Sequence, residues 1–101
     1  MEIREFQKLI WRIYNHHDSR RGVFKTFEWL KSEVAELENA IKHGDLNEVK
    51  SELADVLAWL SSVASLLGVD LEDAAVGKYG NGCPKCHSIP CKCKYRENPN
   101  N

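Results

Sequence analysis

Four carboxylates at helical spacing are the residues of this sequence that could do chemistry together. Glu33 and Glu36 are three residues apart, and so are Glu52 and Asp55. This spacing places the two members of each pair on one side of a helix. Carboxylates gathered in one place repel each other and are costly to desolvate unless a cation joins them. Because Mg²⁺ and Mn²⁺ prefer oxygen ligands of this kind, the pattern predicts a divalent metal site at these residues.

Two helices joined by a short turn would position these carboxylates. Apolar residues recur at helical spacing in residues 26–43 and again in residues 45–67. Thr26 and Asp45 are candidate N-caps, and Gly44 ends the first segment. Antiparallel packing of the two helices would bring the acidic pairs together. A single acidic pair is typical of a solvated surface, but two pairs on consecutive helices favour a shared site.

Each predicted helix also carries a tryptophan beside its acidic pair. On a helical wheel, Trp29 falls on the same flank of the apolar stripe as the first pair, and Trp59 falls at the same edge as the second pair. Carboxylates in line with an aromatic ring, next to the core, are unusual for a purely solvated face. The pattern therefore predicts a walled site instead of an open acidic surface.

The remaining chain predicts two further helices and no strand. One covers residues 3–16, and a short one begins at Asp70 and breaks at residues 78–82. The polar stretch 16–22 between the first two helices is typical of a connection. The apolar arc of residues 45–67 is wider than one helix contact needs, so we expect packing against another subunit. We expect an all-α, four-helix, oligomeric bundle.

The composition excludes several function classes. The net charge of −1 provides no general attraction to nucleic acid or to a membrane surface, so we expect neither as a partner. No apolar run approaches the roughly 20 residues that span a bilayer. The N-terminus is charged and lacks the apolar region of a secretory signal. We therefore expect a small cytoplasmic protein.

All four cysteines lie in residues 83–101, a tail that we expect to be distinct from an all-α domain of residues 1–82. They form a C-x-x-C pair followed by a C-x-C pair. Thiolates at such spacing suit tetrahedral zinc, which would fold a segment too short for its own core. Disulfides and an iron–sulfur cluster are alternatives, and His87 is a candidate replacement ligand. The candidate zinc ligands are Cys83, Cys86, Cys91 and Cys93.

The two acidic motifs and their surroundings resemble the MazG-like all-α nucleoside triphosphate pyrophosphohydrolases. The family pattern is E-E-x-x-E, a variable spacer and E-x-x-D, and here SEVAE at residues 32–36 is followed by ELAD at residues 52–55. The segments 66–72 and 78–81 also resemble the family. Ser32 stands where the family often has the first glutamate, one residue away from the predicted ligands. The resemblance extends from about residue 27 to residue 81.

What the resemblance implies is hydrolysis of a nucleoside triphosphate, commonly a deoxynucleotide, to the monophosphate and pyrophosphate. The four carboxylates would hold Mg²⁺ or Mn²⁺, and the metals would bind the triphosphate and activate water. The resemblance also implies a homodimer or homotetramer, and it puts Lys78 and Asn81 near the substrate. Trp29 and Trp59 would stack on the base or pack in the core.

Other functions remain compatible with the sequence. A related all-α family hydrolyses phosphoribosyl-ATP, which would be a neighbouring enzymatic activity. A non-catalytic helical adaptor with a zinc tail would carry the acidic residues only as solvated charge. Asp18, Arg20 and Arg21 in the predicted connection could face a phosphate or simply face solvent.

Overall fold

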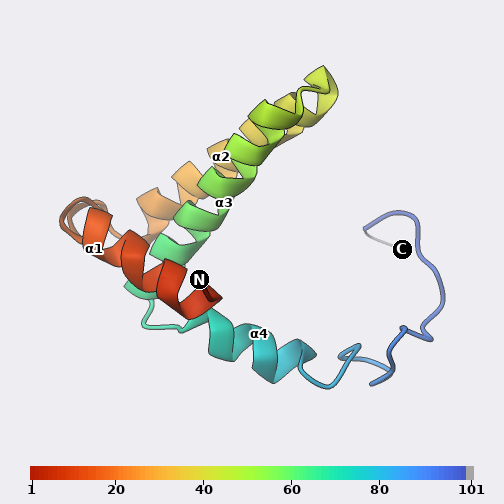
Figure 1. Cartoon of the computed structure of the whole chain (residues 1–101). Helices are drawn as coiled ribbons and strands as arrows, with labels where there is room; N and C mark the ends of the chain where they lie inside the picture. The colour runs from red at the N-terminus through yellow and green to blue at the C-terminus, as the bar shows by residue number, and fades with distance from the viewer. Residues whose placement is uncertain (100–101) are drawn as a thin grey trace. The chain divides into compact units, whose positions relative to one another are not determined.

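The computed structural model describes residues 1–99, and its regular structure there is entirely helical. Four helices follow one another without an intervening strand in the described residues (Figure 1). This confirms the prediction of an all-α chain with four helices. The helices are α1 (Ile3–Arg21), α2 (Val23–His43), α3 (Leu46–Leu66) and α4 (Leu71–Tyr79).

The chain divides into two compact units, the first spanning Met1–Leu71 and the second beginning at Glu72. In the first unit, α2 and α3 lie side by side as an antiparallel hairpin (Figure 1). α1 packs across the end of this hairpin that is remote from the turn at Gly44. The second unit contains most of α4 and the cysteine-rich tail. The predicted domain boundary after residue 82 stays a prediction.

A buried glutamine fastens α1 to the end of α3. Gln7 donates from its side-chain amide to Ser65 Oγ (3.1 Å) and to the carbonyl of Val69 (2.8 Å). Its side-chain oxygen accepts from the backbone N–H of Leu71 (2.8 Å). One side chain thereby satisfies backbone groups of the turn that follows α3, which a buried segment requires.

The first helix is longer than predicted, because the stretch 16–22 is not a connection. α1 continues to Arg21 and stops at Gly22, whose φ is 84°. Asp18 in this stretch is only 2% exposed. The polar composition suggested a loop, but Asp18 has polar partners inside the fold, so its burial stabilises the helix instead of ending it.

The start of α2 also differs from the prediction, because Thr26 is not its N-cap. α2 begins at Val23 with Gly22 at the cap position. Thr26 lies within the first turn and is completely buried, and its backbone N–H donates to the carbonyl of Gly22 (3.1 Å). Threonine is a common N-cap residue. Here, however, Gly22 separates the two helices and occupies the cap position of α2.

The turn between α2 and α3 agrees with the prediction. Gly44 has a φ of 75°, a left-handed conformation that glycine adopts without steric cost. Asp45 caps α3, since its Oδ1 accepts from the backbone N–H of Asn47 at 2.9 Å. This turn fixes which residues of the two helices face each other.

A single chain leaves much of the α2–α3 hairpin uncovered. Its fully buried apolar residues are small in number and include Leu30, Ala40 and Ala64. Large apolar residues such as Leu53 and Ile41 are 52% and 60% exposed. An apolar surface of this kind is typical of an interface between subunits.

Within the described part of the chain, no single helix has the length and apolar character to cross a membrane. The pair α3 and α4 meets the criteria of length and composition only when the two helices are taken together.

Candidate active site

Three of the four predicted carboxylates meet between α2 and α3. α2 contributes Glu33, and α3 contributes Glu52 and Asp55. One carboxylate oxygen from each lies within 4.8 Å of the others. Glu33 and Asp55 are equally far along the chain from Gly44, so antiparallel packing sets them opposite each other. The hairpin turn therefore determines the assembly of this cluster.

The surroundings of Glu33 in this cluster disfavour its charged form. Burial raises the pKa of Glu33, and the neighbouring charges of Asp55 and Glu52 raise it further. Glu52 Oε2 is buried and has no hydrogen-bond partner among the described residues. A buried carboxylate oxygen without a donor is costly, and a cation at this position would satisfy it. The donor set of hard oxygens from two helices fits Mg²⁺ or Mn²⁺.

Glu36 lies outside this group of neighbouring oxygens. It is exposed on α2, where it lines a small hollow of about 90 Å³ together with Ala40, His43 and Glu52. Its charge still reaches Glu33 and contributes to raising that residue's pKa. The structure thus brings three of the predicted ligands together, and the role of Glu36 as a fourth ligand stays a prediction.

The two predicted tryptophans stack on each other. The ring centroids of Trp29 and Trp59 are 5.3 Å apart, and the ring planes differ by 9°. Trp29 is 50% exposed, so the stack is open to solvent at the α2 side. The guanidinium carbon of Arg21 lies 4.8 Å from the centroid of the Trp59 ring, a cation–π distance. The pair forms a wall, while base stacking remains a prediction.

A cavity of about 200 Å³ opens beside the carboxylate cluster. Asp55 belongs both to the cluster and to the cavity lining, so the two features are continuous. α1 and α3 contribute the other walls, which combine polar and aromatic side chains. The lining residues that matter here are Tyr14, His17, Asp18, Arg21, Trp59 and Ser62.

An ion pair with the buried Asp18 holds Arg21 at this cavity. Asp18 accepts from Arg21 Nη1 at 2.9 Å and from Ser62 Oγ at 2.6 Å. Arg21 also donates weakly to Thr26 Oγ1 at 3.5 Å. Because the guanidinium is tied on one side to Asp18 and lies over Trp59 on the other, its position is fixed without a ligand.

From the sequence, Asp18 and Arg21 are predicted to lie in a connection, where they could face a phosphate or solvent. A stronger signal was available, since Ile10, Tyr14 and Asp18 follow one another at intervals of four residues. Extending the helical period past residue 16 would have placed Asp18 on the buried face of α1. Ser62, a polar residue within the apolar arc of α3, was the other indication.

Lys78 and Asn81 lie in the second unit, at the end of α4 and just after it. Lys78 is exposed, and its ammonium nitrogen lies 5.7 Å from the centroid of the Tyr79 ring. Asn81 is also exposed. Contact of either residue with a substrate stays a prediction.

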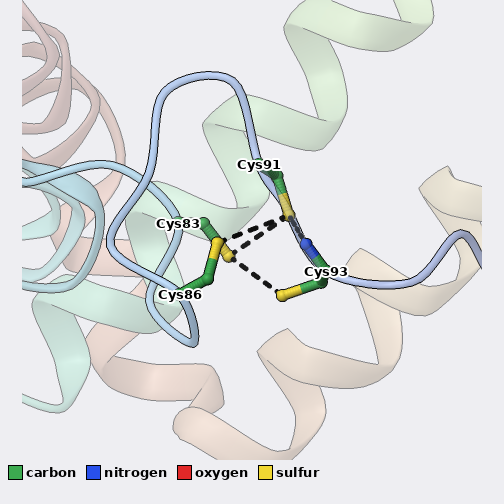
Figure 2. A group of neighbouring side chains, drawn as sticks. All are labelled: Cys83, Cys86, Cys91 and Cys93. Atoms are coloured by element: carbon green, nitrogen blue, oxygen red, sulfur yellow. Dashed lines mark hydrogen bonds between the residues drawn. The ribbon is translucent and has the colours of Figure 1, made fainter.

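The four cysteine sulfurs of the tail also come together, all within 4.8 Å of one another (Figure 2). Backbone N–H donors, chiefly that of Lys92, lower the pKa of Cys86 to about 6. Hydrogen bonding to Cys91 raises the pKa of Cys93 to about 12. The sulfur distances confirm the predicted gathering of the cysteines, which belong to the second unit, whereas the carboxylate cluster belongs to the first.

Comparison with known protein families matches residues 22–87 to the MazG nucleotide pyrophosphohydrolase domain. This span is more than half of the chain and contains α2, α3 and α4 with both acidic motifs. Domains of this family typically use divalent metals. A search of curated proteins finds no match to the chain.

Proposed function

Since the chain belongs to the MazG nucleotide pyrophosphohydrolase family, we propose that it hydrolyses a nucleoside triphosphate to the monophosphate and pyrophosphate with Mg²⁺. The observation that carries this proposal is the meeting of Glu33, Glu52 and Asp55, of which Asp55 also lines a cavity. A nucleotide triphosphate is itself strongly negative, so carboxylates alone would repel it. The site therefore requires a divalent cation between protein and substrate.

Glu33, Glu52 and Asp55 would hold the metal, and Glu36, one helical turn from Glu33 on α2, would complete the ligand set. Bound Mg²⁺ supplies positive charge to the triphosphate and makes water more acidic. A carboxylate oxygen that faces the cavity can accept the proton of the attacking water. No cysteine, serine or histidine nucleophile is needed for this reaction.

The cavity supports binding of the nucleoside part of the substrate. Its volume of about 200 Å³ is below the roughly 300–1,000 Å³ of sites that enclose a whole drug-sized ligand. It would hold the base and part of the sugar, with the triphosphate at the carboxylates. Trp59 contributes an aromatic side chain to the lining, and Arg21, held over that ring, would offer a cation to the bound nucleotide.

The test is release of pyrophosphate from a panel of ribo- and deoxynucleoside triphosphates in the presence of Mg²⁺. We expect release from at least one deoxynucleotide, and none after chelation of the metal. Glu52→Gln should abolish turnover while the helices stay intact, because it keeps shape and removes charge. Glu38→Gln is the matched control, since Glu38 is an exposed residue of α2 that pairs with Lys42.

The panel also separates the alternative functions. Phosphoribosyl-ATP is included as a competitor, and preference for it would assign the chain to the related activity in place of deoxynucleotide hydrolysis. No turnover of any nucleotide with Mg²⁺, together with no effect of Mg²⁺ on the protein, would refute the enzyme and favour a helical adaptor.

We also propose that the chain works as a homodimer or a tetramer built from dimers. The exposed apolar residues of α3, Leu53, Leu57 and Leu60, support this proposal because a lone chain leaves them 39–52% exposed. Sedimentation equilibrium of the full chain measures the mass directly. A monomer at micromolar concentration would contradict the proposal.

A further inference from the structure

The cysteine sulfurs of the tail have the spacing of a single tetrahedral metal site. Cys83 Sγ lies 3.5 Å from Cys91 Sγ and 3.8 Å from Cys93 Sγ, and Cys86 Sγ lies 3.9 Å from Cys91 Sγ (Figure 2). A zinc–sulfur bond of about 2.3 Å in a regular tetrahedron puts the sulfurs about 3.8 Å apart. A disulfide would need about 2.05 Å. The sulfurs are therefore arranged for a shared ion and not for pairing with one another.

The backbone of the tail directs donors at these sulfurs. The N–H of Lys92 donates to Cys86 Sγ and the N–H of Cys93 donates to Cys91 Sγ, each at 3.3 Å. Donors of this kind stabilise negative charge on sulfur and orient its lone pairs, which holds the sulfur in position to bind a metal.

The first pair of cysteines sits on a closed turn. The N–H of His87 donates to the carbonyl of Cys83 (2.7 Å), and the N–H of Cys83 donates to the carbonyl of Ser88 (3.2 Å). His87 has a φ of 57°, a conformation that is uncommon for a residue with a side chain. This turn reverses the chain so that the sulfurs of Cys83 and Cys86 face those of the second pair (Figure 2).

Apolar burial does not explain this defined shape. None of the described residues from 72 onward is buried, and Ile89 and Tyr95 are 84% and 81% exposed. A segment this short cannot build a core and usually needs a metal or a cross-link to hold it. The four sulfurs are the feature of the tail that can supply such a link.

We propose that Cys83, Cys86, Cys91 and Cys93 bind one structural Zn²⁺. Each thiol releases its proton to solvent and coordinates the ion through sulfur, which gives a closed, four-coordinate site with no open position for water. The net charge of −2 on four thiolates with one Zn²⁺ is offset by Lys85, Lys92 and Lys94 in the same segment. The sulfurs are too close together to surround a multi-iron cluster, and His87 is not a ligand.

The experiment measures metal in the full chain after purification without chelator. Elemental analysis should find one zinc per chain, with four thiols that react with a thiol reagent only after zinc is removed. Cys86→Ser and Cys91→Ser should each lose the zinc. His87→Ala should keep it, and so should Glu52→Gln, which separates this ion from any metal at the carboxylates. Co²⁺ added to the metal-free chain should give the intense visible bands of a tetrahedral thiolate site.

Several results would overturn the proposal. They are a chain with four reactive thiols and no metal, disulfides found by intact mass before and after reduction, or iron in place of zinc. Retention of full zinc by either cysteine variant would exclude the assigned ligands. Circular dichroism of the variants checks that α1–α3 remain folded, so loss of zinc can be assigned to the ligand. None of these readouts depends on nucleotide hydrolysis.

Discussion

Replacing Glu52 with glutamine should change stability in opposite directions without and with Mg²⁺. In the metal-free chain, the Glu52 carboxylate has like-charged oxygens of Glu33 and Asp55 within 4.8 Å. One such pair repels by about 0.9 kcal/mol at a dielectric constant of about 80 and by about 3.5 kcal/mol at about 20. Because Asp55 is exposed and Glu33 is only half-buried, solvent screening keeps the total near the lower end. Glu52→Gln should therefore raise the free energy of unfolding by about 2 kcal/mol.

Magnesium should reverse this order. A ligand that binds only the folded state stabilises it by about 2.7 kcal/mol at a concentration about 100 times its Kd. The wild-type chain should gain this stability, whereas the variant, which has lost one ligand and one charge, should gain much less. The two melting temperatures are measured in EDTA and across a Mg²⁺ titration at one protein concentration. A shift of about 4–8 °C is expected for each kcal/mol in a domain of this size.

The matched control is Glu38→Gln, which removes an exposed carboxylate from the same hairpin. It should change stability by less than about 0.5 kcal/mol and leave the Mg²⁺ response unchanged. If Glu52→Gln is less stable than the wild type in EDTA, repulsion does not dominate at this site. If the variant and the wild type respond equally to Mg²⁺, Glu52 does not hold the metal.

Three further variants probe the parts that position the site. Asp18→Ala should lower the free energy of unfolding, measured in urea, by about 3 kcal/mol, because it leaves Arg21 and Ser62 without their buried partner. The control Ser19→Ala, at an exposed residue, should be nearly neutral, and a small loss at Asp18 would show that this network is solvated. Trp59→Ala should raise the KM for a nucleotide about tenfold, because it removes a wall of the cavity and the ring over which Arg21 is held. Trp11→Ala, outside the cavity, should leave the KM unchanged, and equal effects would exclude a role for Trp59 in binding. Gly44→Ala should lower the free energy of unfolding by about 1–2 kcal/mol through the strain of a left-handed backbone alone, because no atom lies within 4 Å of the added Cβ. An unchanged melting temperature would show that the turn relaxes.

The outline of the carboxylate site could be predicted from the sequence because its determinants are local. Helical spacing puts Glu52 and Asp55 on one side of α3, and Gly44 with Asp45 defines the turn that reverses the chain. Given these, the opposition of Glu33 follows from counting residues on either side of the turn. The stacking of the two tryptophans could be anticipated in the same way, as neighbours along one edge.

The cavity could not be predicted, because it depends on contacts between residues far apart in the chain. Asp18 was assigned to a connection on its polarity, and only its partner Ser62, which is 44 residues away, explains why it is buried in a helix. Thr26 was predicted to be an N-cap because threonine commonly caps helices. That preference is the same whether α2 begins at residue 27 or, as in the structure, at Val23. For Asp18 a tertiary contact overrode a local preference, whereas for Thr26 the nearby Gly22 took the cap position.

The sequence by itself determined the helices, the hairpin turn, the acidic motifs and the cysteine spacing, since each rests on chemistry within a few residues. The tertiary structure decided that Glu33, Glu52 and Asp55 form the cluster while Glu36 stands outside it, and that Arg21 is held over Trp59. It also decided that the four sulfurs gather within 4.8 Å of one another, with three of their separations between 3.5 and 3.9 Å. Spacing along a helix states which side a residue occupies, but the rotation and approach of the packed helices determine which of those residues touch.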